Sequence, residues 1–477
     1  MNTLPMRSLS TFLLFLVCTS MHAQQAWTLQ ECVQRAEERN LAILNARLDM
    51  DIAGKNQTRA KWNLLPDLNG GATHGYNYGR VIDRFTNTFA TDEVRTNNFY
   101  LSSNVDLFQG FSKQNSIKQA GIDVEAATKG MEASMNDVRL TVVQAFLDVL
   151  GLRERISAAE TQVENTKLQI SRTDALVEGG RVARAELLTL QSQLAQEEYT
   201  ATDLHSQHDQ RLFALGRGMQ LEPAELRTFD IVAPTLNDAD IVAPALSTDQ
   251  ILDNVIRTNP AYAQAELQVK SAEKSVAIAK AGIIPSLSFN GSLGSGFSGR
   301  NVQQVGDVVV NDPVPIGATA SGETVFAPDY SINTALVPFG KQLDQNFNQS
   351  IGFQLNIPIF NNMRNKYQID QAKVQHEKAR NYTLQVRNDL QGNVLDALVM
   401  QRSAYKQYLA ANKAVEAGTL ALQYAQDRFD QGVITSIELS TSKTTLNRST
   451  ADLIRAKYQY LMATKYLDIL QGVPVTL

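Results

Sequence analysis

Two glutamates at matching points of the sequence are the residues whose type and spacing best suit electrostatic chemistry. Glu186 lies six residues after Gly180, and Glu438 lies six residues after Gly432. Carboxylates that are brought close together favour cations and repel one another unless each has a basic partner. A simpler interpretation is structural, because a glutamate in the first turn of a helix suits the positive end of the helix dipole.

The structural interpretation explains one of these glutamates better than the other. Thr435 and Glu438 have the spacing of a capping box, in which the hydroxyl and the carboxylate each accept a backbone hydrogen bond. The position that matches Thr435 before Glu186 is Ala183, which has no hydroxyl. Capping alone therefore does not account for both glutamates.

Other chemical patterns in the sequence are weaker. His205 and His208 are three residues apart on a predicted helix, but nothing nearby completes a metal site, so a solvated helix face is the better interpretation. Three glycines have the spacing of a dinucleotide-binding loop without a helix behind them, which indicates strand-end and loop glycines: Gly294, Gly296 and Gly299. We predict no enzyme activity, no cofactor and no metal.

The first 23 residues have the pattern of a secretory signal peptide. Arg7 precedes an apolar run over 9–17, and small or neutral residues lead to a predicted cleavage after Ala23. Cys18 follows a valine, whereas a lipoprotein signal requires a small residue there, so lipid attachment is not expected. After cleavage Cys32 is the only cysteine, which excludes an intrachain disulfide.

Charge and hydropathy limit the possible partners. The formal net charge of −5 gives no basic face for nucleic acid. Beyond the signal peptide no apolar run approaches the roughly 18 residues that a transmembrane helix needs. If the mature chain enters a membrane, it must do so as β-strands.

The mature sequence consists of two tandem copies of one unit. Residues 40–68 match 259–287 at a constant offset of 219, and later residues match at an offset of 252, for example Phe108 with Phe360. The difference of 33 residues is an insertion between Pro285 and Ser350, which we expect to be an exposed loop. The predicted domains are a signal peptide (1–23), a first repeat (24–218), an equatorial linker (219–246) and a second repeat (247–477).

Each copy is predicted to contain the same helices and strands. The helices are a first helix (29–63 and 248–282), a long helix (112–178 and 364–430, on the order of 100 Å at about 1.5 Å per residue) and a returning helix of half that length. The strands are 67–78 and 286–296, each followed by a strand with period-two alternation, 99–107 and 351–359. Aromatic residues near the strand ends fit a membrane girdle: Tyr76, Tyr78, Phe108, Phe111, Phe297 and Phe360.

Four membrane-length strands imply self-assembly. The smallest single-chain membrane barrels have about eight strands, and an open sheet edge in lipid leaves backbone groups unsatisfied. Several copies would then complete one barrel, with the long helices continuing its wall. The alternative at this stage is a soluble sandwich built from two hairpins.

The glycine turns carry a resemblance to a known family. Residues 429–432 and 435–439, repeated at 176–187, resemble the signature of the TolC-type outer-membrane efflux proteins, and residues 27–40 and the prolines before the strands add to the likeness. The resemblance implies a membrane α/β fold, in which a homotrimer forms a twelve-stranded β-barrel in the outer membrane and a long α-helical barrel in the periplasm.

The same resemblance implies a function. The chain would form the channel, or exit duct, of a tripartite efflux or type I secretion system. The implied partners are a periplasmic adaptor (membrane fusion protein), an inner-membrane pump of the RND or ABC type, and outer-membrane lipid. A non-channel periplasmic coiled-coil adaptor is the alternative function, although the duplicated strand pairs argue against it.

The resemblance also assigns roles to residues at the turns. The implied periplasmic constriction comprises Glu186, Glu438, Arg181, Arg184 and Thr441, and the implied adaptor contacts are Gly179, Gly180, Arg181, Gln431, Gly432 and Val433. Thr441 and Ile434 replace an acidic residue and an arginine of the family's well-studied member, so that member's latch is not expected here. We expect Arg181 or Arg184 to pair with Glu186 instead, and any gate to be asymmetric between the copies.

Overall fold

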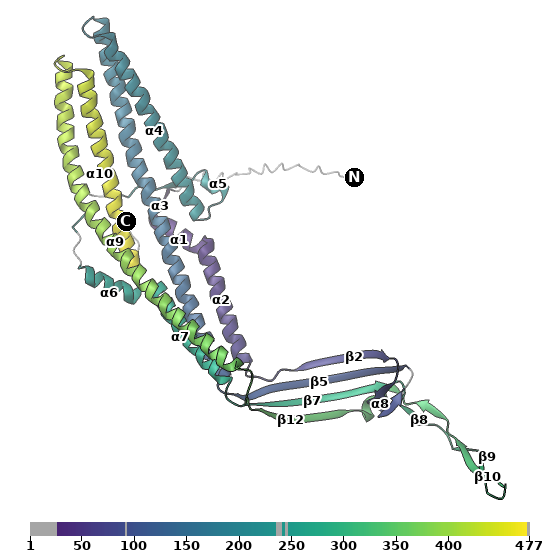
Figure 1. Ribbon diagram of the computed structural model, residues 1–477. Coiled ribbons are helices and arrows are strands. Elements are labelled where there is room, and N and C mark those ends of the chain that lie inside the picture. The colour runs from purple at the N-terminus through teal and green to yellow at the C-terminus, as the bar shows by residue number, and fades with distance from the viewer. Residues whose placement is uncertain (1–25, 91–92, 235–240, 244–246, 475–477) are drawn as a thin grey trace, which may run out of the picture. The chain divides into compact units, whose positions relative to one another are not determined.

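The computed structural model describes residues 26–90, 93–234, 241–243 and 247–474 (Figure 1). The predicted signal peptide, with Cys18 and the cleavage after Ala23, lies outside the described residues, as does part of the predicted linker. The chain divides into two compact units. A helical unit comprises Met1–Met50, Ala126–Ala265 and Thr383–Leu477, and a sheet unit comprises Asp51–Glu125 and Glu266–Tyr382. Each unit contains segments of both tandem copies, and the predicted tandem domains remain a prediction.

The two copies contain helices of matching lengths. The long helices are α3 (Ser112–Glu178) and α9 (Arg364–Asp430), and the returning helices are α4 (Arg184–Gly218) and α10 (Ser436–Leu470). These bounds confirm the predicted long and returning helices. Among the described residues, none of the helices combines the length and the hydrophobicity needed to cross a membrane.

The predicted first helix of each copy is wrong, because it is two helices. Copy one has α1 (Leu29–Arg39) and α2 (Leu41–Trp62), and copy two has α6 (Thr248–Thr258) and α7 (Pro260–Ala281). The break falls at Asn40 and Asn259, whose backbones are extended. Each asparagine side chain accepts a hydrogen bond from a backbone N–H two residues later, so it caps the next helix. Pro260 adds to the break, because proline disfavours a helical residue before it.

The helical unit has one main hydrophobic core. It is centred on α3, where Val143, Phe146 and Leu147 are buried, and it includes residues of α1, α4, α9 and α10. A short helix, α5 (Pro223–Leu226), and a parallel strand pair, β1 (Ala26–Trp27) with β6 (Asp230–Ile231), lie in the same unit. The apolar positions of helices from both copies therefore share one core.

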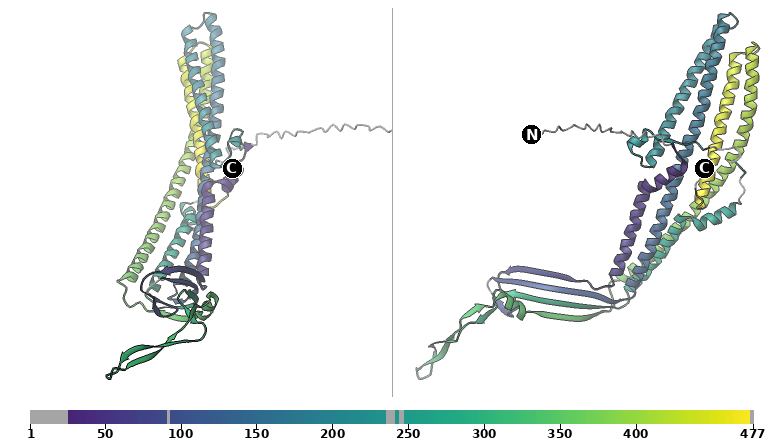
Figure 2. Two further views of the ribbon diagram at one scale, coloured as in Figure 1. Left: turned by 90° about the vertical axis from the view of Figure 1, so that its right-hand side faces the viewer. Right: turned by 180° about the vertical axis from the view of Figure 1, so that it is seen from behind.

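The sheet unit is built on four antiparallel strands in the order β12-β7-β5-β2. The strands are β2 (Asn69–Asn77), β5 (Val94–Gln109), β7 (Ser286–Ser298) and β12 (Asn348–Asn356), which lie side by side in Figure 2. The four predicted strands are confirmed, but β12 ends at Asn356, so the alternation predicted as far as Ile359 extends beyond the strand. The central pair, β5 with β7, joins the two copies.

The sheet has one apolar and one polar face. The register places Leu101 beside Leu293 and Phe289 beside Phe353, whereas Asn104 lies beside Asn290 on the other face. Phe353 on the outer strand β12 is 72 % exposed. Large side chains of the apolar face are exposed in this chain: Phe99, Leu101, Leu293, Ile351, Phe353 and Leu355.

The insertion in copy two is more structured than the exposed loop we predicted. It contains β8 (Val302–Gln304), β9 (Val309–Ala318), β10 (Thr324–Ser331), β11 (Thr334–Leu336) and α8 (Phe339–Gln345), and β9 pairs with β10 as a hairpin. A second small hairpin, β3 (Val81–Asp83) with β4 (Thr88–Ala90), belongs to copy one. The insertion is structured because its polar side chains bond to backbone groups at the free edge of a strand. The Gln342 side chain accepts a hydrogen bond from the Ser298 N–H and donates one to the Ser298 carbonyl.

Candidate functional site at the two hairpin turns

The two turns between long and returning helices have the same backbone structure. After α3, the N–H groups of Gly180 and Arg181 donate to the carbonyls of Val177 and Leu176, at 3.0 and 2.9 Å. After α9, Gly432 and Val433 make the equivalent bonds, both at 2.8 Å, to Phe429 and Arg428. This is the Schellman motif, which needs a left-handed residue, and Gly180 and Gly432 have φ of +70° and +74°.

The starts of the returning helices differ in the way predicted from Ala183 and Thr435. Thr435 Oγ1 accepts a hydrogen bond from the Glu438 N–H at 3.4 Å, whereas Ala183 gives no side-chain cap to α4. The predicted capping box is only half present, because in the described part of the chain the Glu438 carboxylate makes no return bond to the Thr435 N–H. Glu438 is exposed, so its charge is available to solvent or to a partner.

Glu186 has a different environment from Glu438. It is half-buried, and its Oε2 atom is buried without a hydrogen-bond partner among the residues that the structure describes. Within the described residues, Glu186 forms no ion pair with Arg181 or Arg184, so the pair we predicted does not form within one chain. Both arginines are exposed. Thr441, the fifth predicted constriction residue, donates to the Ile437 carbonyl of its own helix at 2.8 Å.

A buried polar seam below the turns was not predicted. Four polar residues of α3 lie along its buried face at alternating spacings of four and three: Gln162, Thr166, Gln169 and Thr173. The Gln162 amide donates to Glu197 of α4 at 3.0 Å, and the Gln426 amide of α9 donates to Gln169 at 2.9 Å. The heptad spacing of these polar residues was the signal in the sequence that could have revealed the seam.

Lys443 of α10 lies in the same part of the helical unit and is only 5 % exposed. Burial lowers the pKa of Lys443, and the charge of Glu197 opposes this shift. Next to the seam, a cavity of about 660 Å³ is lined by polar and apolar residues of all four helices, including Gln162, Glu197, Leu204 and Leu446. The helices below the turns are thus joined by polar contacts as well as by buried apolar side chains, among them Leu190 and Leu439.

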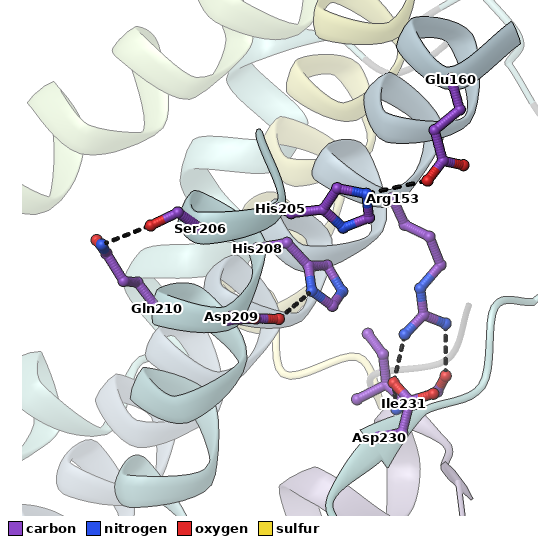
Figure 3. A network of polar contacts seen from close by, with 9 residues as sticks. All are labelled: Arg153, Glu160, His205, Ser206, His208, Asp209, Gln210, Asp230 and Ile231. Carbon is purple, nitrogen blue, oxygen red and sulfur yellow. Dashed lines mark hydrogen bonds and ion pairs between the residues drawn. The ribbon is translucent and has the colours of Figure 1, made fainter. Parts of the chain in front are cut away.

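The two histidines on α4 have separate partners (Figure 3). His205 Nε2 lies 2.9 Å from a carboxylate oxygen of Glu160 on α3, and His208 Nδ1 lies 3.1 Å from Asp209. Among the described residues, no group of three or more His, Cys, Asp or Glu side chains could hold a metal ion. His205 is thus an exposed residue with a carboxylate partner, whereas the His208 side chain is largely buried and contacts Asp209 of its own helix.

Arg153 fastens the predicted linker to α3. Its guanidinium donates to the Ile231 carbonyl at 2.8 Å and pairs with the carboxylate of Asp230 (Figure 3). Asp230 and Ile231 form β6, which pairs with β1, so this arginine holds the middle of the predicted linker against a long helix.

Solved outer-membrane channels share this fold. The CmeC outer membrane channel of Campylobacter jejuni matches with a TM-score of 0.75 at 16% sequence identity, over 93% of this chain and 85% of CmeC. The likeness extends over both the four-stranded sheet and the paired helical hairpins, and at this identity it shows a shared fold.

The sequence comparison identifies the family. The model of the outer membrane efflux protein family matches residues 32–217 and 251–473, which is most of the chain. The chain therefore belongs to the outer membrane efflux protein family. The resemblance to TolC-type proteins, the predicted efflux-channel function and the predicted outer-membrane localisation are confirmed, and the alternative of a periplasmic adaptor is not favoured.

Two curated relatives show how the similarity is distributed. The outer membrane efflux protein BepC of Brucella suis is 23% identical over 451 residues, which cover 92% of this chain and 83% of BepC. The cation efflux system protein CusC of Escherichia coli is 25% identical over 175 residues, which cover 35% of this chain and only 38% of CusC. The predicted constriction and adaptor-contact residues remain predictions.

Proposed function

We propose that three copies of this chain join their sheets edge to edge into one twelve-stranded barrel that crosses the outer membrane. The observation that carries this proposal is the sheet itself. Its outer strands β2 and β12 each have one edge unpaired within the described residues, and its apolar face is exposed. In lipid, a closed barrel satisfies the edges, places the apolar face toward the hydrocarbon and turns the polar face toward a water-filled lumen.

The helices of the three copies then continue the conduit into the periplasm. An inner-membrane pump of the RND or ABC type, through a periplasmic adaptor, delivers substrate to this conduit, and the adaptor contacts the two glycine turns. Exposed residues at both turns, among them Arg181, Gln431 and Val433, support this assignment. The three copies together bring six carboxylates, from Glu186 and Glu438, to the periplasmic end of the conduit, where they favour cations.

A charge placed on either face of one strand tests the barrel. Phe353 and Gln354 are neighbours on β12 and point to opposite faces of the sheet. An arginine on a lipid face costs about 2–4 kcal/mol near the bilayer midplane. Phe353→Arg is therefore expected to reduce the yield of heat-modifiable trimer and of conducting channels in planar bilayers, whereas Gln354→Arg retains both. Equal yields for the two variants would refute the proposed orientation of the sheet.

A further inference from the structure

The charges of the sheet unit are strongly segregated. Four segments connect helices to the sheet, at 52–66, 110–122, 274–285 and 357–369, and together they contain nine basic residues and no acidic residue. The whole chain has 44 basic and 49 acidic residues. We call these nine residues the basic collar: Lys55, Arg59, Lys61, Lys113, Lys118, Lys274, Lys280, Arg364 and Lys366.

The fold gathers the four segments at one end of the sheet. Ser286, the first residue of β7, pairs with Gln109 and Asn356, the last residues of β5 and β12. Hydrogen bonds also join the ends of neighbouring helices in pairs. Lys113 donates to the carbonyl of Asn63 at 2.7 Å, and the Asn365 amide donates to the Gly282 carbonyl. The collar is therefore one feature of the structure, although its residues come from four parts of the sequence.

Most residues of the basic collar have no ion-pair partner within the described residues. Lys113 pairs with Asp106 at 3.0 Å, but the other eight form no ion pair within the described part of the chain. Seven of the nine are exposed in this chain, the exceptions being Lys113 and Lys274. A group of like charges without internal partners raises the free energy of the isolated protein and favours an anionic partner.

An exposed apolar ring lies in and beside the same four segments. Phe111 and Met363 occupy equivalent positions at the start of α3 and α9, and both have left-handed backbones, with φ of +66° and +62°. Side chains that large rarely adopt this conformation, yet both copies do so. The exposed apolar residues here include Trp62, Leu65, Leu68, Phe111, Ile283, Ile359, Phe360 and Met363.

The opposite end of the sheet has no comparable cluster of basic residues alone. Residues 301–340, which contain the β9–β10 hairpin, have four acidic residues and no basic one. The same end also carries Arg80, Arg84, Arg95, Arg300 and Lys341, so its charges are mixed, whereas the four collar segments contain basic residues without acidic ones. Only the end next to the helices suits a surface that is anionic at its headgroups and apolar immediately above them.

We infer that the basic collar binds the phosphate headgroups of anionic phospholipids in the periplasmic leaflet, and that it sets the depth of the sheet in the membrane. This inference rests on the proposed barrel. Each basic residue close to an anionic leaflet contributes about 1 kcal/mol, equivalent to roughly fivefold in association. Screening by salt should weaken the interaction, because the collar side chains are exposed.

The test measures lipid selectivity around the reconstituted full-length protein. Spin-labelled phosphatidylglycerol and phosphatidylcholine are compared in vesicles of phosphatidylcholine, with wild type, with Lys61→Gln/Lys366→Gln, and with the control Lys406→Gln/Lys413→Gln. The control removes the same charge from exposed lysines of α9 in the helical unit. Wild type and control are expected to prefer the anionic lipid at low salt. The collar variant, which keeps five of the seven exposed collar charges, is expected to lose part of that preference, by up to about fivefold for each residue replaced.

The outcomes separate the inference from the proposed barrel. Equal association of the two lipids with the wild type, or an equal preference in the collar and control variants, would overturn the inference while leaving conductance intact. A wild-type protein that neither inserts nor conducts in either lipid would instead overturn the proposed barrel on which the inference rests.

Discussion

Replacing Gly180 or Gly432 with alanine should weaken the hairpin turns through backbone strain alone. The left-handed conformation of each glycine costs an alanine about 1–2 kcal/mol. A Cβ at either position meets no atom of the described residues within 4 Å, so packing neither adds to this cost nor offsets it. Alanine also lowers the conformational entropy of the unfolded chain, which stabilises the folded protein by about 0.4–1 kcal/mol. The expected net loss is about 1 kcal/mol per turn.

Hydrogen exchange at the turn measures this loss locally. In wild type the Arg181 N–H is held by the Leu176 carbonyl at 2.9 Å. A loss of about 1 kcal/mol should speed its exchange roughly fivefold in Gly180→Ala. The matched control is Gly392→Ala, because Gly392 lies inside α9 and its Cβ would also meet no atom within 4 Å. Alanine there should stabilise the helix by about 0.8–1 kcal/mol and slow the local exchange.

The opposite signs of the two variants make the reasoning testable. Both substitutions add one methyl group to open space, and only the backbone conformation differs. If Gly180→Ala and Gly392→Ala shift exchange in the same direction at their own sites, strain in the left-handed region does not control the turn. The equivalent variant Gly432→Ala should behave like Gly180→Ala, since both turns have the same hydrogen bonds.

Three further predictions concern the helix break, the buried thiol and the turn arginine. Asn259→Ala should lower the free energy of unfolding, measured by denaturant titration, by about 0.5–2 kcal/mol, because two backbone N–H groups lose their acceptor. Asn259→Asp keeps an acceptor and should retain most of the wild-type stability in the same titration. Burial raises the pKa of Cys32 from 9.0 to about 12, so its contribution to stability is complete below pH 9 and is lost as pH rises toward 12. Unfolding titrations should therefore show wild type weakening relative to Cys32→Ala above pH 9, and parallel pH curves would contradict this. Arg184→Glu should raise single-channel conductance or antibiotic leakage by adding repulsion beside Glu186, whereas Arg172→Glu, farther from the turn, should change neither, and unchanged behaviour of Arg184→Glu in both assays would count against a role in closure.

Much of the local structure could be predicted because it depends on local patterns. The offset between the copies predicted matching helices, and the ends of α3 and α9 agree with the sequence because Gly180 and Gly432 are the residues that best tolerate a left-handed turn. Period-two alternation likewise located the strands. The breaks at Asn40 and Asn259 were missed, because the apolar spacing continues across them while the side chains cap the next helix.

The candidate site was predictable only in part. The sequence located both turns and their difference in capping at Ala183 and Thr435. It did not indicate that Glu186 is half-buried while Glu438 is exposed, because burial depends on which helices pack against each residue. The polar seam of α3 was missed for the same reason, since glutamine and threonine usually occupy a solvated helix face.

The sequence by itself determined the repeated order of helices and strands, the polar and apolar faces of each strand, and the membership of the outer-membrane efflux class. Periodicity and turn chemistry are sufficient for the order of elements and the faces of the strands, because they act over a few residues. The class follows from the likeness of the two turn segments to the TolC-type signature. Only the tertiary structure decided that β5 pairs with β7 across the two copies and that the four basic segments meet at one end of the sheet. These features depend on contacts between residues from 50 to about 200 positions apart, whose partners no local pattern specifies.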